Sequence, residues 1–139
     1  MGENLTKQMA VRMGLILKTI RPAIVAKAIA GFDTFMVGSK GPELSVFVDP
    51  NCIFRREVYL QAQPLVRSAS LQLWIVMVGF LKPTSFTKAA AILMRADPTQ
   101  ALAADETTFD VAHEESGIKP AKSTPSAIKR AVQDNTRLL

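Results

Sequence analysis

Alternation of apolar and polar positions in the middle of the chain predicts a small β-sheet. Residues 44–48 are rich in β-branched and aromatic side chains and are followed by an Asp-Pro pair, which is typical of a strand that ends in a turn. Residues 57–63 alternate with a period of two, and residues 68–73 do the same before they merge into the apolar segment 74–78. We therefore expect a central antiparallel sheet over about 44–81.

A second interpretation of this region stays open. Pro64 and Pro83 bracket the apolar residues 65–81 in the way that prolines commonly bracket a helix. Periodicity alone does not separate a buried strand from a buried helix in so apolar a segment. The alternative to the sheet is therefore a helix over 65–81 and an all-α fold.

Helical patterns precede the expected sheet. Good helix formers begin at Thr6, Pro22 ends a first helix or opens a second one, and Gly31 is a stop signal. The basic residues of this segment do not gather on one face, so the helices have poor amphipathicity. The pattern predicts a basic helical arm over residues 1–32.

Helical patterns also follow the expected sheet. Ser85 is placed to cap an Ala-rich helix over 86–95. Asp97 and Pro98 form the cap and the first-turn proline of a second helix. A last helix opens at Pro125 and carries an apolar face. These signals predict three helices in the C-terminal part of the chain.

Together these elements predict one α+β domain over 1–139. Its parts are the arm (1–32), a core (33–119) that includes a short edge strand at 107–113, and a linker with the terminal helix (120–139). A chain of 139 residues with 48% hydrophobic residues can bury one core of the usual size. No run reaches the roughly 18 apolar residues that a membrane span requires.

The residue types favour no catalytic chemistry. The chain has one histidine, His113, and one cysteine, Cys52, which allows neither a multi-histidine nor a paired-cysteine metal site. The phosphate-binding glycine patterns are absent as well. A single cysteine excludes a disulfide framework and favours a reducing compartment, and we interpret Cys52 as a small apolar core residue. We expect no enzyme, no metal and no cofactor, and we expect both residues to be dispensable for activity.

The net charge of +5 conceals a segregation of charge along the chain. Residues 1–96 hold 12 basic and 5 acidic side chains, residues 97–115 hold six acids without any Lys or Arg, and residues 116–139 hold five basic and one acidic side chain. A basic body with one acidic strip attracts polyanions or the basic surface of its own or a neighbouring chain. We expect the strip to dock on such a surface.

Two sets of charged residues are therefore the candidate functional residues. The first set is predicted to bind nucleic acid, because release of counterions from phosphates drives such binding. It comprises Lys7, Arg12, Lys18, Arg21, Lys27, Lys40, Arg55 and Arg56. The second set is predicted to mediate self-association. It comprises Asp105, Glu106, Asp110, Glu114 and Glu115.

The predicted function is that of a non-enzymatic structural protein that assembles into homo-oligomers. Nucleic acid would lie near its basic surface, as in a coat or capsid-type subunit of a virion. Its partners would be copies of itself and nucleic acid such as RNA, and its location the cytoplasm or a virion. The alternatives are a small monomeric RNA- or DNA-binding module and a peripheral membrane-associated structural protein.

Overall fold

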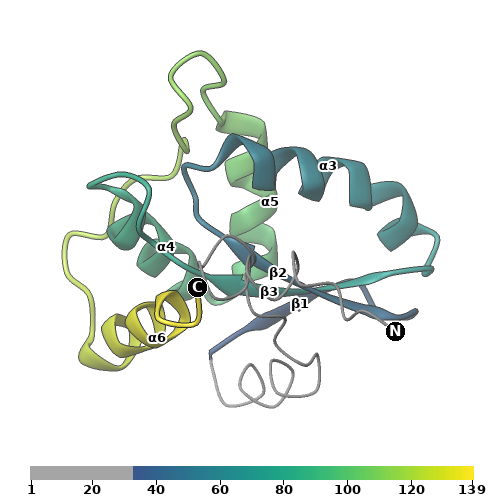
Figure 1. Cartoon of the computed structure of the whole chain (residues 1–139), viewed down its shortest axis with the longest axis horizontal. Helices are drawn as coiled ribbons and strands as arrows, with labels where there is room; N and C mark the ends of the chain where they lie inside the picture. Colours follow the sequence, from purple (N-terminus) through teal and green to yellow (C-terminus); the bar gives the residue numbers. More distant parts are fainter. Residues whose placement is uncertain (1–32) are drawn as a thin grey trace, which may run out of the picture. The chain divides into compact units, whose positions relative to one another are not determined.

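A three-stranded sheet and four helices make up the part of the chain that the computed structural model describes, residues 33–139 (Figure 1). In chain order they are β1 (Phe35–Val37), β2 (Glu43–Val48), α3 (Ile53–Arg67), β3 (Gln72–Met77), α4 (Ser85–Leu93), α5 (Pro98–Thr108) and α6 (Ser126–Thr136). The predicted α+β class is confirmed, and the all-α alternative is wrong. The predicted arm over 1–32 lies outside the described residues.

The sheet is mixed and not antiparallel throughout as predicted. Its strand order is β1-β3-β2, with β3 in the centre. β1 runs antiparallel to β3, with Phe35 opposite Ile75, whereas β2 runs parallel to β3, with Val46 opposite Ile75. The parallel pair arises because a whole helix, α3, returns the chain to the start of the sheet between β2 and β3.

Helix α3 replaces the strand that was predicted over 57–63. The residues that α3 buries are Arg55, Tyr59 and Ala62, which recur at helical spacing. The strand interpretation placed Val58, Leu60 and Ala62 on one face and Tyr59 on the other, but Val58 and Leu60 are 45% and 38% exposed while Tyr59 and Ala62 are both buried. The error came from reading a period of two in a segment whose buried positions follow a period near 3.6.

The other predicted elements agree with the structure to different degrees. The helix start at Asp97 is confirmed, because the side chain of Asp97 accepts a hydrogen bond of 3.0 Å from the Gln100 amide. Ser85 is the first residue of α4 and not its cap. The edge strand predicted over 107–113 is absent from the described residues, which show only an isolated bridge between Asp110 and Glu115 there.

The core joins alternate residues of β3 to the inner sides of the helices. Leu73, Ile75 and Met77 are at most 1% exposed. The residues that pack with them are Val37, Val48, Tyr59, Ala62, Ala89, Ala90, Ile92, Leu102 and Val132. Figure 1 shows α4 and α6 next to each other at one end of the sheet.

Helix α6 is attached to the sheet by a buried polar side chain. Asn135 is fully buried, and its amide donates a 2.9 Å hydrogen bond to the carbonyl of Met77 at the end of β3. The division of the chain into an arm, a core and a terminal helix stays a prediction, because it includes residues outside the described part. None of the described helices has the length and apolarity that crossing a bilayer requires.

The turn between β1 and β2 generates a first prediction. Gly41 has φ +99°, and a Cβ built on it would lie 2.6 Å from the Ser70 carbonyl carbon and 2.7 Å from the Leu71 amide nitrogen. Gly41→Ala combines a left-handed backbone with a clash against backbone atoms, so we expect it to lower the free energy of unfolding by about 2 kcal/mol. Urea denaturation measures this, with the exposed Ser39→Ala as control. Equal midpoints for the two variants would contradict the prediction.

Candidate active site

Residues 49–52 form a turn that joins the end of β2 to the start of α3, and we call it the Cys52 turn. Cys52 is the N-cap residue of α3, with φ −86° and ψ 115°, and its amide donates a 3.0 Å hydrogen bond to the carbonyl of Asp49. Its thiol is free and half-buried. The prediction that Cys52 is a core residue is wrong, because the side chain lies at the edge of the core where a helix begins.

Asp49 holds the turn against the loop that follows β3. The carboxylate is almost fully buried, and one of its oxygens accepts hydrogen bonds from the amides of Phe80 and Leu81, at 2.8 and 3.0 Å. The other oxygen accepts from the amide of Asn51 at 3.0 Å and from the hydroxyl of Ser85 at 2.7 Å. One carboxylate therefore fixes the Cys52 turn, the loop after β3 and the start of α4 to one another.

Asn51 attaches the same turn to two further segments. Its side-chain amide donates to the hydroxyls of Thr84 and Ser85 at 3.1 and 3.0 Å. Its side-chain oxygen accepts from the amide of Ser116 at 3.0 Å and from the ammonium of Lys88 at 3.3 Å. All the hydrogen-bonding groups of this buried side chain are therefore used, which fixes its orientation.

Arg55 lies under the turn, three residues after Cys52, and is 4% exposed. Its Nε donates a 3.0 Å hydrogen bond to the carbonyl of Asp49, and its Nη2 donates to the carbonyl of Pro50. On the other side, the guanidinium forms ion pairs with Asp105, at 2.9 Å, and with Glu106, both on α5. Arg55 therefore connects the Cys52 turn to α5.

The electrostatics of this cluster are set by burial. Loss of solvent raises the pKa of Glu106 to about 7, and the guanidinium of Arg55 lowers it only in part. The Oε2 atom of Glu106 is buried and has no hydrogen-bond partner among the described residues. At the rim, a hydrogen bond from Lys88 lowers the pKa of Glu115, which also lies 3.3 Å from the ammonium of Lys82.

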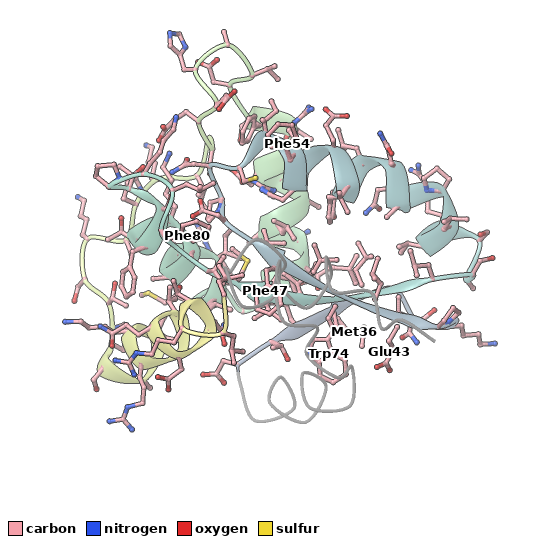
Figure 2. All side chains as sticks on the ribbon, viewed as in Figure 1. Met36, Glu43, Phe47, Phe54, Trp74 and Phe80 are labelled. Atoms are coloured by element: carbon pink, nitrogen blue, oxygen red, sulfur yellow. The ribbon has the colours of Figure 1, made fainter. Side chains whose placement is uncertain are left out.

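The position of Cys52 suits nucleophilic chemistry of a thiolate. The free N–H groups and the dipole at a helix N-terminus favour a negative charge there. Two large aromatic side chains near the turn are exposed: Phe54, in the first turn of α3, by 78%, and Phe80, in the loop bound to Asp49, by 56% (Figure 2). Within residues 33–139, no three His, Cys, Asp or Glu side chains are grouped to hold a metal ion.

The structure describes three of the predicted nucleic-acid-binding residues, and these three do not form one exposed basic surface. Lys40 is exposed in the turn between β1 and β2, whereas Arg55 is buried in ion pairs and is not available to a phosphate. Arg56 is half-buried and lies 3.8 Å from a carboxylate oxygen of Glu106. The remaining members lie outside the described residues. They are Lys7, Arg12, Lys18, Arg21 and Lys27.

Part of the acidic strip docks on basic side chains of its own chain, as predicted for the whole strip. Asp105 and Glu106 pair with Arg55, and Glu115 pairs with Lys82 and Lys88. The two other acids of the set, Asp110 and Glu114, are exposed, and Asp110 contacts the exposed ring of His113 at 2.8 Å. The buried members, Asp105 and Glu106, neutralise Arg55 next to the Cys52 turn. A role of the set in self-association stays a prediction.

Sequence reasoning missed the residues that build this site: Asp49, Pro50, Asn51, Ser85, Lys88 and Ser116. The Asp-Pro-Asn-Cys string was interpreted only as the end of a strand. A polar turn between a strand and a helix that starts with cysteine was the available signal, since such a position activates thiols. The partners of the turn lie far along the chain, so the sequence offered no sign of them.

Two curated proteins are similar to this chain. The thiol:disulfide interchange protein DsbG of Pseudomonas aeruginosa is 34% identical over 94 residues, which is 68% of this chain and 35% of that protein. DsbG of Escherichia coli K12 is 34% identical over 98 residues, which is 68% of this chain and 36% of that protein. The chain therefore spans about a third of the length of these relatives. No family model matches the chain.

Two solved structures share the fold. One is DsbG of Helicobacter pylori, with a TM-score of 0.57, 16% identity, and coverage of 83% of this chain and 54% of that one. The other is a periplasmic thioredoxin-like protein of Salmonella enterica serovar Typhimurium, with a TM-score of 0.51, 24% identity, and coverage of 85% and 66%. The described part of the chain therefore resembles thioredoxin-like α+β proteins in fold.

These comparisons correct the functional predictions made from the sequence. Both relatives are named for thiol:disulfide interchange, which is enzymatic chemistry, so the predicted non-enzymatic, self-assembling coat or capsid subunit is wrong. The predicted partners, copies of the chain and RNA or other nucleic acid, are corrected on the same ground. The predicted location in the cytoplasm or a virion is overturned as well, because the similar proteins include one described as periplasmic.

The raised pKa of Glu106 predicts a specific pH dependence of stability. A carboxyl that binds its proton more tightly in the folded chain adds stability below its unfolded value, near 4.5, and this stability is lost as the pH rises through about 7. The free energy of unfolding of Glu106→Gln should therefore lack the decline that the wild-type chain shows between these values. Urea denaturation across pH 4.5–8 tests this, with Glu57→Gln as the exposed control. Parallel profiles for wild type and Glu106→Gln would refute it.

Proposed function

We propose that the chain rearranges disulfide bonds in other proteins, with Cys52 as the single reacting thiol. The observation that carries this is the free Cys52 at the N-terminus of α3, in a turn held by buried hydrogen bonds. The relatives named for thiol:disulfide interchange and the thioredoxin-like fold support the same chemistry. Because the chain covers about a third of those relatives, the activity is a proposal and not a transfer of their names.

The reaction is an exchange in which bonds and electrons balance. The thiolate of Cys52 attacks one sulfur of a substrate disulfide, an S–S bond forms between Cys52 and the substrate, and the original S–S bond breaks to release a substrate thiolate. That thiolate then attacks another disulfide of the substrate. In the last step a substrate thiolate attacks the mixed disulfide and expels Cys52 in its starting form, so no net oxidation or reduction occurs.

The residue three positions after Cys52 decides between rearrangement and net redox transfer. Dithiol oxidoreductases carry two cysteines in a Cys-X-X-Cys arrangement, and the second thiol closes a disulfide with the first. Here that position is Arg55, whose side chain is buried in ion pairs. A local dithiol is therefore absent from the start of α3, and the mixed disulfide at Cys52 is resolved by thiols from the substrate or from solution.

The proposed substrates are polypeptides that contain both a disulfide and a free thiol. Such substrates occur where disulfides form and persist, as in the bacterial periplasm. We therefore place the activity in an oxidising compartment outside the cytoplasm. The exposed Phe54 gives the surface beside the thiol an apolar contact for incompletely folded chains (Figure 2).

The proposal predicts disulfide rearrangement without any external thiol. A small secreted protein with scrambled disulfides and one free thiol is incubated with the chain, and native disulfides are followed by reverse-phase chromatography. We expect wild type to speed the recovery of native pairs several-fold while the total number of free thiols stays constant. Cys52→Ser should show only the background rate, because serine forms no mixed disulfide.

The matched control is His113→Ala. The ring of His113 is exposed in the loop after α5 and contacts only the exposed Asp110 among the described side chains, so its loss should leave the rate unchanged. Recovery of native disulfides by Cys52→Ser at the wild-type rate would refute the proposal. So would repeated net oxidation of a fully reduced peptide by the wild-type chain, because one thiol has no means of catalysing it.

A further inference from the structure

We propose that Arg55 is the positioning residue of the Cys52 thiol. Arg55 stands at the sequence position, three after the first cysteine, where a dithiol enzyme carries its second cysteine, and its guanidinium fixes the Cys52 turn to α5. This inference rests on the proposed function, because the position of a thiol matters only if the thiol reacts. Its measurable consequence, the reactivity of Cys52, does not depend on any protein substrate.

The contacts of Arg55 converge on the backbone that fixes Cys52. The carbonyl of Asp49 accepts the 3.0 Å hydrogen bond from Nε of Arg55 and also the 3.0 Å hydrogen bond from the amide of Cys52. The next carbonyl, that of Pro50, accepts from Nη2. Two consecutive carbonyls just before the thiol are therefore held by one rigid, planar group, which limits rotation of the turn.

Stability alone does not account for an arginine at this position. Removing a guanidinium and two carboxylates from water carries a desolvation penalty. Replacing such a buried ion-pair cluster by apolar side chains of similar volume commonly leaves the protein equally stable or more stable. Arg55, Asp105 and Glu106 are each at most 4% exposed. What an apolar side chain cannot do is donate to the carbonyls of Asp49 and Pro50, so the arginine is explained by the geometry it imposes.

The charges around Arg55 also determine how its loss would act on the thiol. On α5, Asp105 and Glu106 face the guanidinium, and Arg56 of α3 lies beside Glu106. On the far side of the turn are the carboxylate of Asp49 and, across Asn51, Lys88, which pairs with Glu115. A neutral residue at 55 removes the main cation beside Asp105 and Glu106. Glu106, whose pKa burial raises to about 7 and Arg55 lowers in part, then takes up a proton more readily, and the negative charge that remains on Asp105 opposes a thiolate at the start of α3.

The test measures alkylation of Cys52 by iodoacetamide in the full chain from pH 5 to pH 9. Arg55→Met should lower the rate constant at pH 7 several-fold and move the midpoint of the rate-pH curve upward, because it leaves the buried carboxylate of Asp105 without its cation. Arg56→Met is the matched control, because it removes a cation from the same helix turn, and the side chain of Arg56 lies beside Glu106 but makes no hydrogen bond to the Cys52 turn. Its alkylation rate constant should stay within about two-fold of the wild-type value. A purely structural role would lower the unfolding midpoint and leave the rate-pH midpoint in place.

A second variant keeps the test decisive if Arg55→Met does not fold. Arg55→Lys retains the charge but replaces the forked donor by a single ammonium, so the Cys52 amide should exchange its hydrogen several-fold faster than in wild type. Wild-type exchange at Cys52 in a folded Arg55→Lys, or an unchanged rate-pH midpoint in a folded Arg55→Met, would overturn the inference. Failure of the wild-type chain to rearrange disulfides would refute the proposed function alone.

Discussion

Buried charge is the constraint on which the arrangement around Cys52 depends. Arg55 and Lys88 are both at most 4% exposed, and a buried cation is tolerated only where anions and carbonyls satisfy all its donors. The partners of Arg55 come from the Cys52 turn and α5, and those of Lys88 come from Asn51, Glu115 and the carbonyl of Ser116. Satisfying two cations therefore brings α3, α4, α5 and the segment around residue 115 to one place.

The sequence predicted the elements whose signals are local. The strand ending before Asp49, the helix start at Asp97 and the last helix follow from a few neighbouring residues each, and they are found where expected. Residues 57–63 were wrongly predicted to form a strand. Their apolar and polar side chains do alternate, but this alternation does not determine which of them are buried in α3. Arg55, the first residue that α3 buries, is inside only because carboxylates 50 and 51 residues later neutralise it.

The candidate site was less predictable than the fold for the same reason. A lone Cys52 without a second cysteine matches no redox motif. The residues after β3 that bond to Asp49 and Asn51 in its turn lie 31 to 65 positions further along the chain. Docking on basic side chains was predicted for the whole acidic strip and is found for Asp105, Glu106 and Glu115, but charge segregation does not indicate what such docking is for. The buried members of the strip neutralise cations beneath a reactive turn, which a count of charges along the sequence does not distinguish from an assembly surface.

An arginine in place of a second thiol changes what the proposed enzyme can turn over. A dithiol site frees itself from a trapped substrate by attack of its own second cysteine, at the expense of reducing the substrate. At the Cys52 turn that route is closed, so the mixed disulfide lasts until a thiol of the substrate or of the solution reaches it. Substrates with all cysteines bridged supply that thiol only after the first exchange, and fully reduced substrates offer no disulfide to attack. The site is therefore selective for partly and wrongly bridged chains, through the absence of a group and not through recognition of a sequence.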